Sequence, residues 1–386
     1  MSNKKPLVLF LNNIAPLYRK NVWTKYLESE KMNLNFFFGK ETSSGIKTIN
    51  FNEQKLRPHA HKINILKNVY IKQYLVWQNF NIFNWIKKKP QTIILLGEFN
   101  ILSNWFITLF ARINNIEIVS KGHGMYGNEK GVKLLARKSF LKICNKHLVY
   151  EKHGKSILSK NGIDPDSIHI LFNSLDYEKQ KKYRELIPSL NKSEILHFFA
   201  KPELPTLIFI GRLTKVKKLE LIIDAIKLLQ NDTPINLLVV GNGSERSNLE
   251  KLASENLNSD CYYFYGESYD EAVNNNLIAV SDLCVSPGNV GLTAIHSLSY
   301  GTPVCTHSNL MEQMPEAEAI TDKVNGILFD QDNVESLKNA ILWWINNTKD
   351  RQKVREKCYS VIDTYYNPNY QKKVIENLID GNKPLI

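Results

Sequence analysis

Two segments of the chain carry residues that could hold a phosphate group. The first covers residues 286–304, where Gly288 and Gly291 lie in a loop ahead of a helical stretch that Pro303 brings to an end. At such a helix start, free backbone amides and the positive end of the helix dipole face an anion. We therefore expect an anion to be bound by the backbone of five consecutive residues: Gly288, Asn289, Val290, Gly291 and Leu292.

The second segment, residues 205–219, is an apolar strand that ends at Gly211 and is followed by Arg212 and Lys217. Arginine can grip phosphate oxygens through two N–H groups, and lysine adds a point charge. Another buried strand runs into a glycine turn at Gly243. The order of these elements predicts an open α/β unit whose ligand lies at the carboxyl ends of the strands. Along the chain they are a strand, the cation pair, a helix, a second strand, the glycine turn and the anion loop.

Residues 205–330 resemble the nucleotide-sugar domain of the family 4 retaining glycosyltransferases, which have the two-Rossmann GT-B architecture. The resemblance rests on Gly-Arg-Leu-x-x-x-Lys from Gly211 to Lys217, and on a second pattern made by Gly291, Leu292, Gly301, Pro303 and Val304. It implies an α/β fold with two Rossmann-like domains whose parallel sheets face each other across a cleft. It also implies that Arg212 and Lys217 hold the diphosphate of the donor.

The chain departs from this family at two positions. The family usually has two glutamates eight residues apart, and here those positions are Gly288 and His296. A glycine cannot replace a carboxylate, although its amide can donate to an anion. His296 is either a ligand of the nucleotide ribose or a satisfied helix histidine. Glu316 either approaches the donor sugar, as the resemblance implies, or is a favourable acid at a helix start after Pro315.

The first half of the chain also alternates between strands and helices. We predict strands over residues 7–11, 34–38, 92–96 and 116–120. The last of these leads to His123, which has a glycine on each side and lies where α/β proteins keep their ligands. The resemblance places a histidine here beside the donor sugar. The candidate catalytic residues are thus His123, Arg212 and Lys217.

These patterns predict that the chain is divided into two domains, a linker and a terminal helix. Residues 1–185 form an acceptor-side Rossmann-like domain, and residues 186–204 form a linker. Residues 205–365 form the nucleotide-sugar domain, and residues 366–386 form a helix that packs back on the first domain.

Charge is unevenly distributed along the chain. Residues 1–180 contain 28 Lys plus Arg and 12 Asp plus Glu, a balance of +16, which leaves 22 against 26, or −4, for the rest. The basic half either contacts anionic lipid or an acidic acceptor, with residues 133–146 as a candidate membrane helix, or it is a solvated basic surface. A nucleic-acid partner is not expected, because the strongest motifs are phosphate-binding turns rather than basic stripes with stacking aromatic residues.

The composition of the chain bears on its location in the cell and on whether it binds a metal. No apolar stretch is long enough to span a bilayer, and five cysteines are scattered without metal-ligand spacing. We expect a cytoplasmic protein, peripheral at the inner face of the membrane if the basic half binds lipid. No metal and no cofactor are expected.

The resulting expectation is a metal-independent hexosyl- or related glycosyltransferase. It would move a sugar from a UDP- or GDP-sugar to a saccharide or lipid-linked saccharide, with retention, in surface polysaccharide biosynthesis. Two alternatives stay open: a nucleotide-sugar epimerase of the same fold, and a non-catalytic, glycosyltransferase-like binding subunit.

Overall fold

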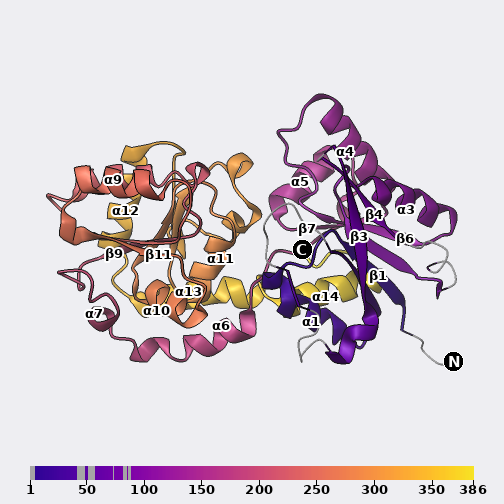
Figure 1. Cartoon of the computed structure of the whole chain (residues 1–386), viewed down its shortest axis with the longest axis horizontal. Helices are drawn as coiled ribbons and strands as arrows, with labels where there is room; N and C mark the ends of the chain where they lie inside the picture. The colour runs from indigo at the N-terminus through magenta and orange to yellow at the C-terminus, as the bar shows by residue number, and fades with distance from the viewer. Residues whose placement is uncertain (1–4, 41–47, 51–56, 73, 81–84, 86–87) are drawn as a thin grey trace. The chain divides into compact units, whose positions relative to one another are not determined.

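The computed structural model describes residues 5–40, 48–50, 57–72, 74–80, 85 and 88–386. The chain divides into two compact units, one made of residues 1–176 with 367–386 and the other of residues 177–366 (Figure 1). Each unit is a mostly parallel sheet covered by helices. The predicted fold class, two Rossmann-like α/β units, is confirmed.

The described residues of the first unit form an eight-stranded sheet in the order β4-β3-β2-β1-β5-β6-β7-β8. The pairs are parallel except for β3 and β4, an antiparallel edge hairpin that the sequence patterns did not predict. The strand bounds are β1 Leu7–Asn12, β2 Asn33–Gly39, β3 Ile63–Ile71, β4 Leu75–Asn79, β5 Thr92–Leu96, β6 Glu117–Gly122, β7 Lys146–Val149 and β8 Ile168–Ile170.

Alternation along the central strand divides the core of the first unit into two layers. Val8 and Phe10 of β1 pack toward α1 and α14, whereas Leu9 and Leu11 pack toward α3 and α4. The helices of this unit are α1 Lys20–Leu27, α3 Leu102–Ile113, α4 Gly131–Ile143, α5 Lys152–Lys160 and α14 Pro368–Ile379.

The second unit has a parallel sheet in the order β11-β10-β9-β12-β13-β14. Its strands are β9 Thr206–Ile210, β10 Asn236–Val240, β11 Tyr262–Gly266, β12 Leu283–Ser286, β13 Val304–His307 and β14 Gly326–Phe329. Its helices are α6 Tyr177–Arg184, α7 Lys192–Ile195, α8 Glu220–Leu229, α9 Arg246–Asn256, α10 Glu271–Val280, α11 Leu292–Ser299, α12 Val334–Asn347 and α13 Arg351–Thr364. Helices α8, α9 and α12 share one core with the sheet.

The domain boundary differs from the prediction. The second unit begins at Tyr177 rather than at residue 205, so the expected linker, residues 186–204, belongs to this unit. The first helix of the unit, α6, is held by polar contacts, which explains why its sequence shows no repeating pattern of apolar residues. Arg184 of α6 donates to the Ser299 carbonyl at 2.7 Å and to Asp363 at 2.7 Å, and its guanidinium lies 4.3 Å from the Tyr359 ring centre.

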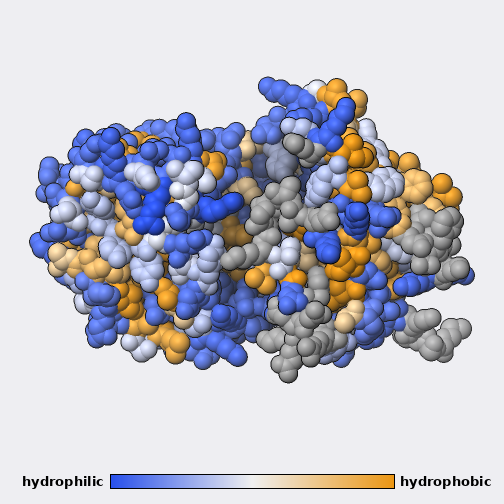
Figure 2. Space-filling model, in the orientation of Figure 1, coloured by the Kyte–Doolittle hydropathy of each residue, from blue (hydrophilic) through white to orange (hydrophobic). Residues whose placement is uncertain are grey.

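The first unit exposes an apolar stripe along α3. Phe106, Leu109 and Ile113 recur at helical spacing and are 53%, 53% and 81% exposed. Trp77 of β4 extends the stripe, because its ring centre lies 6.5 Å from that of Phe106. Figure 2 shows apolar side chains on this part of the unit. No helix in the described part of the chain has both the length and the apolar character needed to cross a bilayer.

Helix α14 is tied to the first unit through Gln371, which is fully buried. Its Oε1 accepts from the Tyr26 hydroxyl at 3.0 Å and the Ser174 hydroxyl at 3.2 Å, and its Nε2 donates to the Phe172 carbonyl at 2.7 Å. The amide therefore joins α1, the residues after β8 and α14.

We expect Gln371→Leu to lower the free energy of unfolding of the first unit by about 1–3 kcal/mol or more, because three buried polar groups lose this partner. Urea unfolding of the full chain, followed by circular dichroism, measures the change. Gln352→Leu on the exposed side of α13 is the matched control. Equal unfolding midpoints for the two variants would contradict a structural role for the Gln371 amide.

Candidate functional site

The loops of the second unit converge at the point where its strand order reverses. Strands β9 and β12 are neighbours, yet the chain continues from β9 to β10 on one side and from β12 to β13 on the other. In open α/β sheets this arrangement opens a crevice at the carboxyl ends of the two strands. The residues from Gly211 and from Pro287 onward, in the two predicted segments 205–219 and 286–304, follow these strands, so the structure brings them together.

A direct contact joins the two segments. Lys217 Nζ donates to the Asn289 carbonyl at 2.5 Å and to Asn289 Oδ1 at 2.8 Å, and the Gly288 amide donates to the Lys217 carbonyl at 3.1 Å. Burial and the positive charge of Arg212 lower the pKa of Lys217, whereas the charge of Glu316 raises it. Lys217 is thus fixed on the loop, with a second cation close by.

Arg212 is exposed, and its guanidinium makes no hydrogen bond or ion pair with any residue that the structure describes. Its five N–H donors remain available to a ligand. Together with Lys217 it creates a positive potential at the mouth of the β9–β12 crevice.

The anion loop supplies fewer amides than the sequence predicts. The Gly288 amide is engaged by Lys217, and the Val290 amide donates to Gln313 Oε1 at 2.9 Å. These two predicted donors are therefore occupied in the structure. Within the described chain the amides of Gly291 and Leu292 have no acceptor, and α11 has no side-chain cap at its N-terminus. Gly291 has φ 55°, a conformation that favours glycine.

Three further glycines of the predicted site permit close backbone contact between the loops. A Cβ at Gly243 would lie 2.2 Å from the Leu213 carbonyl oxygen, and one at Gly288 would lie 2.0 Å from that of Val216. Gly211 lies beneath Gly241, whose Cβ would approach the Gly211 oxygen to 1.9 Å. These positions hold the loops after β9, β10 and β12 against one another.

His296, on α11, is paired with an acid that the sequence did not single out. His296 Nε2 lies 3.1 Å from Glu271 Oε1, which also accepts from the Tyr300 hydroxyl at 2.5 Å and from Gln180 at 3.5 Å. Burial raises the pKa of Glu271, but the hydrogen bonds from His296, Tyr300 and Gln180 outweigh it and lower the pKa to about 2. A carboxylate is thus present beside the family's second glutamate position, supplied by α10.

Gln313 holds the anion loop in place, a role that no sequence motif predicts. Besides accepting from Val290, it donates to Thr306 Oγ1 at 2.8 Å and to the His307 carbonyl at 3.0 Å. Glu316 is 2% exposed in the short 3-10 helix Pro315–Ala319, close enough to influence the pKa of Lys217.

In the first unit, His123 follows β6 in a firmly held loop. The carbonyl of Gly124, a residue with φ 70°, accepts from Arg137 Nη1 at 3.1 Å. Arg137 also pairs with Glu98 and Glu129, each at 3.2 Å. Burial and the positive charges of Arg137, Arg19 and Lys121 lower the pKa of His123 to about 4, so its imidazole is neutral at neutral pH.

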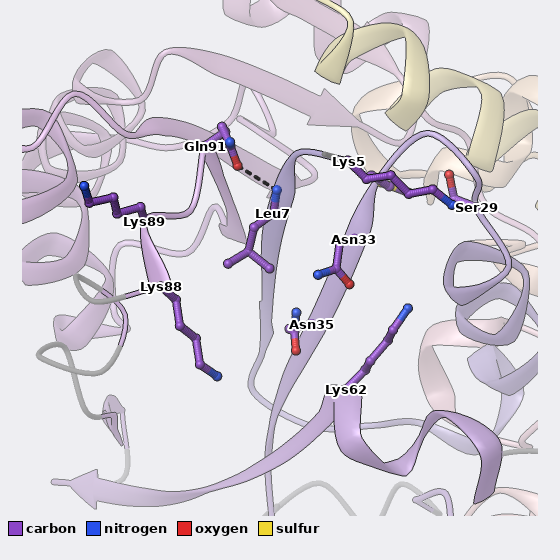
Figure 3. A pocket seen from close by; sticks show the side chains of 10 residues that line it. Lys5, Leu7, Ser29, Asn33, Asn35, Lys62, Lys88, Lys89 and Gln91 are labelled. Atoms are coloured by element: carbon purple, nitrogen blue, oxygen red, sulfur yellow. Dashed lines mark hydrogen bonds between the residues drawn. The ribbon is translucent and has the colours of Figure 1, made fainter. Parts of the chain in front are cut away.

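A cavity of about 760 Å³ opens at the opposite, amino-terminal edge of the first unit's sheet (Figure 3). Asn33 and Asn35 of β2 lie among its lining residues, together with Lys5, Lys62, Lys88 and Lys89. Lys5, Lys88 and Lys89 are exposed and Lys62 is half-buried, so these ammonium groups keep access to water. Among the described residues of the whole chain, no group of three His, Cys, Asp or Glu side chains is arranged to hold a metal ion.

Residues 192–361 match the family described as glycosyl transferases group 1. An uncharacterized glycosyltransferase of Methanocaldococcus jannaschii is 27% identical over 58% of this chain and 57% of its own length. The poly(glycerol-phosphate) alpha-glucosyltransferase of Bacillus subtilis is 25% identical over 42% of this chain and 24% of its own length. The chain thus spans less than two thirds of each relative.

Solved structures match nearly the whole chain. Anabaena HepE in complex with UDP has a TM-score of 0.70 at 12% identity, with 97% of this chain and 100% of that chain covered. The lipopolysaccharide outer core galactosyltransferase WaaB has a TM-score of 0.69 at 15% identity, with 97% and 99% covered. These likenesses show that the fold is that of the GT-B glycosyltransferases.

We expect the second unit to lose stability as the pH falls from about 4.5 toward 2. The folded pKa of Glu271 is below its ordinary value, so the stabilisation is present above that value and is lost as the carboxylate gains a proton. Urea unfolding at a series of pH values should show a weaker pH dependence in Glu271→Gln. Glu255→Gln, at an exposed position on α9, is the control. An unchanged pH dependence in Glu271→Gln would show that other carboxylates cause the effect.

Proposed function

We propose that this chain, whose residues 192–361 match the group 1 glycosyl transferases, transfers a sugar from a nucleoside diphosphate sugar to an acceptor hydroxyl. The proposal is carried by the convergence of Arg212, Lys217 and the uncapped N-terminus of α11 at one crevice. Two cations and free amides suit the charge of a diphosphate. They would stabilise the negative charge that develops on the departing nucleotide.

The proposed reaction requires no metal ion, because the two cations and the helix terminus already supply positive charge. We propose retention at the anomeric carbon. The bond from this carbon to the diphosphate breaks, a bond to the acceptor oxygen forms on the same face, and a leaving phosphate oxygen takes the acceptor's proton. No side chain can replace the family's first glutamate at Gly288, because even a Cβ would meet the Val216 carbonyl.

For the ribose we propose recognition by the His296–Glu271 pair. Glu271 Oε2 and His296 Nδ1 have no partner among the described residues. Oε2 can therefore accept from a ribose hydroxyl, and Nδ1 can accept from or donate to one, while the bond between Nε2 and Oε1 fixes the ring. On the first unit we assign His123 to the transferred sugar, where a neutral imidazole can exchange hydrogen bonds with hydroxyl groups.

The proposed donor is a UDP- or GDP-sugar, and the solved complex of Anabaena HepE with UDP favours testing UDP first. The proposed acceptor is a saccharide or lipid-linked saccharide in surface polysaccharide biosynthesis. Support comes from the basic charge of the first half of the chain and from the likeness in fold to the lipopolysaccharide transferase WaaB. The reaction would take place in the cytoplasm at the inner face of the membrane.

For membrane contact we propose the apolar stripe on α3 and β4 rather than α4. Arg137 of α4 is turned inward and paired with acids, so the predicted basic helix does not offer its full charge. The α3 stripe lies next to Arg112, within a half of the chain that carries +16. Exposed apolar side chains with surrounding positive charge suit a bilayer that contains anionic lipid.

We expect Arg212→Ala to weaken UDP binding by roughly 10- to 100-fold, the loss of a charged hydrogen bond, and to lower transfer accordingly. Calorimetry with UDP measures affinity, and chromatography of released nucleoside diphosphate, with and without acceptor, measures turnover. Lys251→Ala, at a side chain that is 77% exposed on α9, is the control. Donor conversion without acceptor would favour an epimerase. Tight donor binding without turnover would favour a binding subunit.

We expect Phe106→Ser with Ile113→Ser to weaken binding to vesicles of phosphatidylglycerol and phosphatidylcholine by roughly 100-fold or more, as measured by sedimentation of the protein with the vesicles. Each exposed apolar side chain that enters the bilayer contributes roughly 1.5–3 kcal/mol. Val132→Ser with Leu135→Ser on α4 is the matched control, since these side chains are 82% and 66% exposed. An effect confined to the α4 pair would transfer the contact to that helix, and equal binding by all three proteins would exclude both surfaces.

A further inference from the structure

Two cations of the first unit are buried at the carboxyl edge of its sheet. Arg19 ends the 3-10 helix Leu17–Arg19 after β1, and Lys121 lies in β6. Their exposed fractions are 6% and 2%. Tyr150 follows β7 and lies between them. Because β1, β6 and β7 run parallel in one sheet, the three residues meet at the edge where such sheets bind ligands.

Both cations depend on one hydroxyl oxygen. Lys121 Nζ donates to the Tyr150 hydroxyl at 2.7 Å, and Arg19 Nη2 donates to the same oxygen at 3.3 Å. Aromatic faces complete the surroundings: Lys121 Nζ lies 5.6 Å from the Phe10 ring centre, and the Arg19 guanidinium lies 5.5 Å from that of Tyr18. Neither cation forms an ion pair with any residue in the described part of the chain.

Such an arrangement is costly without a counter-charge. A buried ammonium or guanidinium group loses hydration that only an anion or several hydrogen bonds restore. Burial lowers the pKa of Lys121, and the neighbouring Arg19 lowers it further, while Tyr150 opposes both. The alternative to a bound anion is that Lys121 is neutral and serves only to hydrogen-bond Tyr150. In that case the charged guanidinium of Arg19 would still be buried with tyrosines as its only partners among the described residues.

Another buried arginine of the first unit, Arg137, has a structural role and serves as a comparison. Arg137 is similarly buried, yet it has Glu98 and Glu129 at 3.2 Å and the Gly124 carbonyl at 3.1 Å. Arg19 and Lys121 have no such carboxylates among the residues that the structure describes. This difference indicates that their counter-ion is none of the described residues, and it favours an anion that the protein binds. The lysines of the cavity in Figure 3 keep access to water and therefore make no comparable demand.

We propose that Arg19, Lys121 and Tyr150 bind a phosphate group of the acceptor. Two cations match a phosphate monoester or diphosphate, which carries nearly two negative charges, better than a carboxylate with one. The guanidinium can hold two oxygens in its planar fork, and the ammonium group adds a point charge. Leu17 and Tyr18 are 42% and 41% exposed, so Arg19 lies just beneath the surface.

This assignment to the acceptor rests on the proposed transferase function, because the diphosphate of the donor already has Arg212, Lys217 and α11 in the second unit. The phosphate site itself does not rest on that function. Binding can therefore be measured in a chain whose donor site is disabled.

Inorganic pyrophosphate is the probe, titrated calorimetrically into full-length Arg212→Ala protein at constant ionic strength. We expect binding that Lys121→Met or Arg19→Gln weakens roughly tenfold or more, as for the loss of a charged hydrogen bond. Lys62→Met, in the cavity of Figure 3, is the matched control and should bind as its parent. Absence of pyrophosphate binding in Arg212→Ala, or equal binding after Lys121→Met, would overturn the site.

The unfolding stability of variants distinguishes a phosphate site from a set of residues that only supports the core. An unpaired buried cation held for a ligand predicts that Lys121→Met keeps or gains stability in the absence of anions, because a packed apolar side chain replaces it. A loss of stability equal to that of Tyr150→Phe would assign the three residues to core packing and overturn the proposal.

The source of the phosphate follows from UDP titrations of the single variants Lys121→Met and Arg19→Gln. Unchanged UDP affinity with reduced turnover on a phosphate-bearing acceptor assigns the site to the acceptor. Reduced UDP affinity would instead assign the bound phosphate to the donor. If UDP binds neither variant nor parent, the transferase proposal fails while the pyrophosphate result stands by itself.

Discussion

Backbone contacts that only glycine permits hold the candidate donor site together. Gly241 lies against the Gly211 carbonyl, Gly243 against that of Leu213, and Gly288 against that of Val216, all closer than a Cβ would allow. These contacts bring the loops after β9, β10 and β12 into one layer. Several backbone amides of the loops are hydrogen-bonded within the chain as a result. The charge of the site consequently comes from the side chains of Arg212 and Lys217 and from the start of α11.

In the described part of the chain, charged groups with little access to water are stabilised in different ways. Arg137 is neutralised by two carboxylates, and Glu271 is surrounded by the side-chain donors His296, Tyr300 and Gln180. Among the described residues, the charged groups of Arg19 and Lys121 have only tyrosine hydroxyls and aromatic rings as partners. The first two arrangements are complete within the fold, whereas the third is electrostatically incomplete. The places where the chain lacks internal compensation are thus the strongest indication of what it binds.

The sequence predicted those parts of the fold that rest on buried strands followed by glycine. The four strands expected in the first half correspond to β1, β2, β5 and β6, and the cation pair lies at the strand end where it was expected. The edge hairpin of β3 and β4 was missed, because its polar residues and partial exposure leave no clear apolar pattern. The expected linker, residues 186–204, instead belongs to the second unit, where Lys192 donates to Asp282 at 2.7 Å.

Site details were less predictable for a physical reason. Which amide of the anion loop is occupied depends on contacts from distant positions, such as Lys217 to Gly288 and Gln313 to Val290. A single glutamine in a loop carries no signal of this role. Glu271 was missed because it reaches His296 from a different helix, 25 residues away in the sequence.

The return of α14 to the first unit has a consequence for how the protein is made. The second unit is continuous from residue 177 to residue 366, whereas the first consists of two stretches on either side of it. During synthesis the second unit can therefore complete its core while the sheet of the first still lacks Val374, Ile375 and Leu378. A ribosome that stalls before α14 would leave an unfinished amino-terminal half attached to a finished carboxyl-terminal one, exposed to chaperones and proteases.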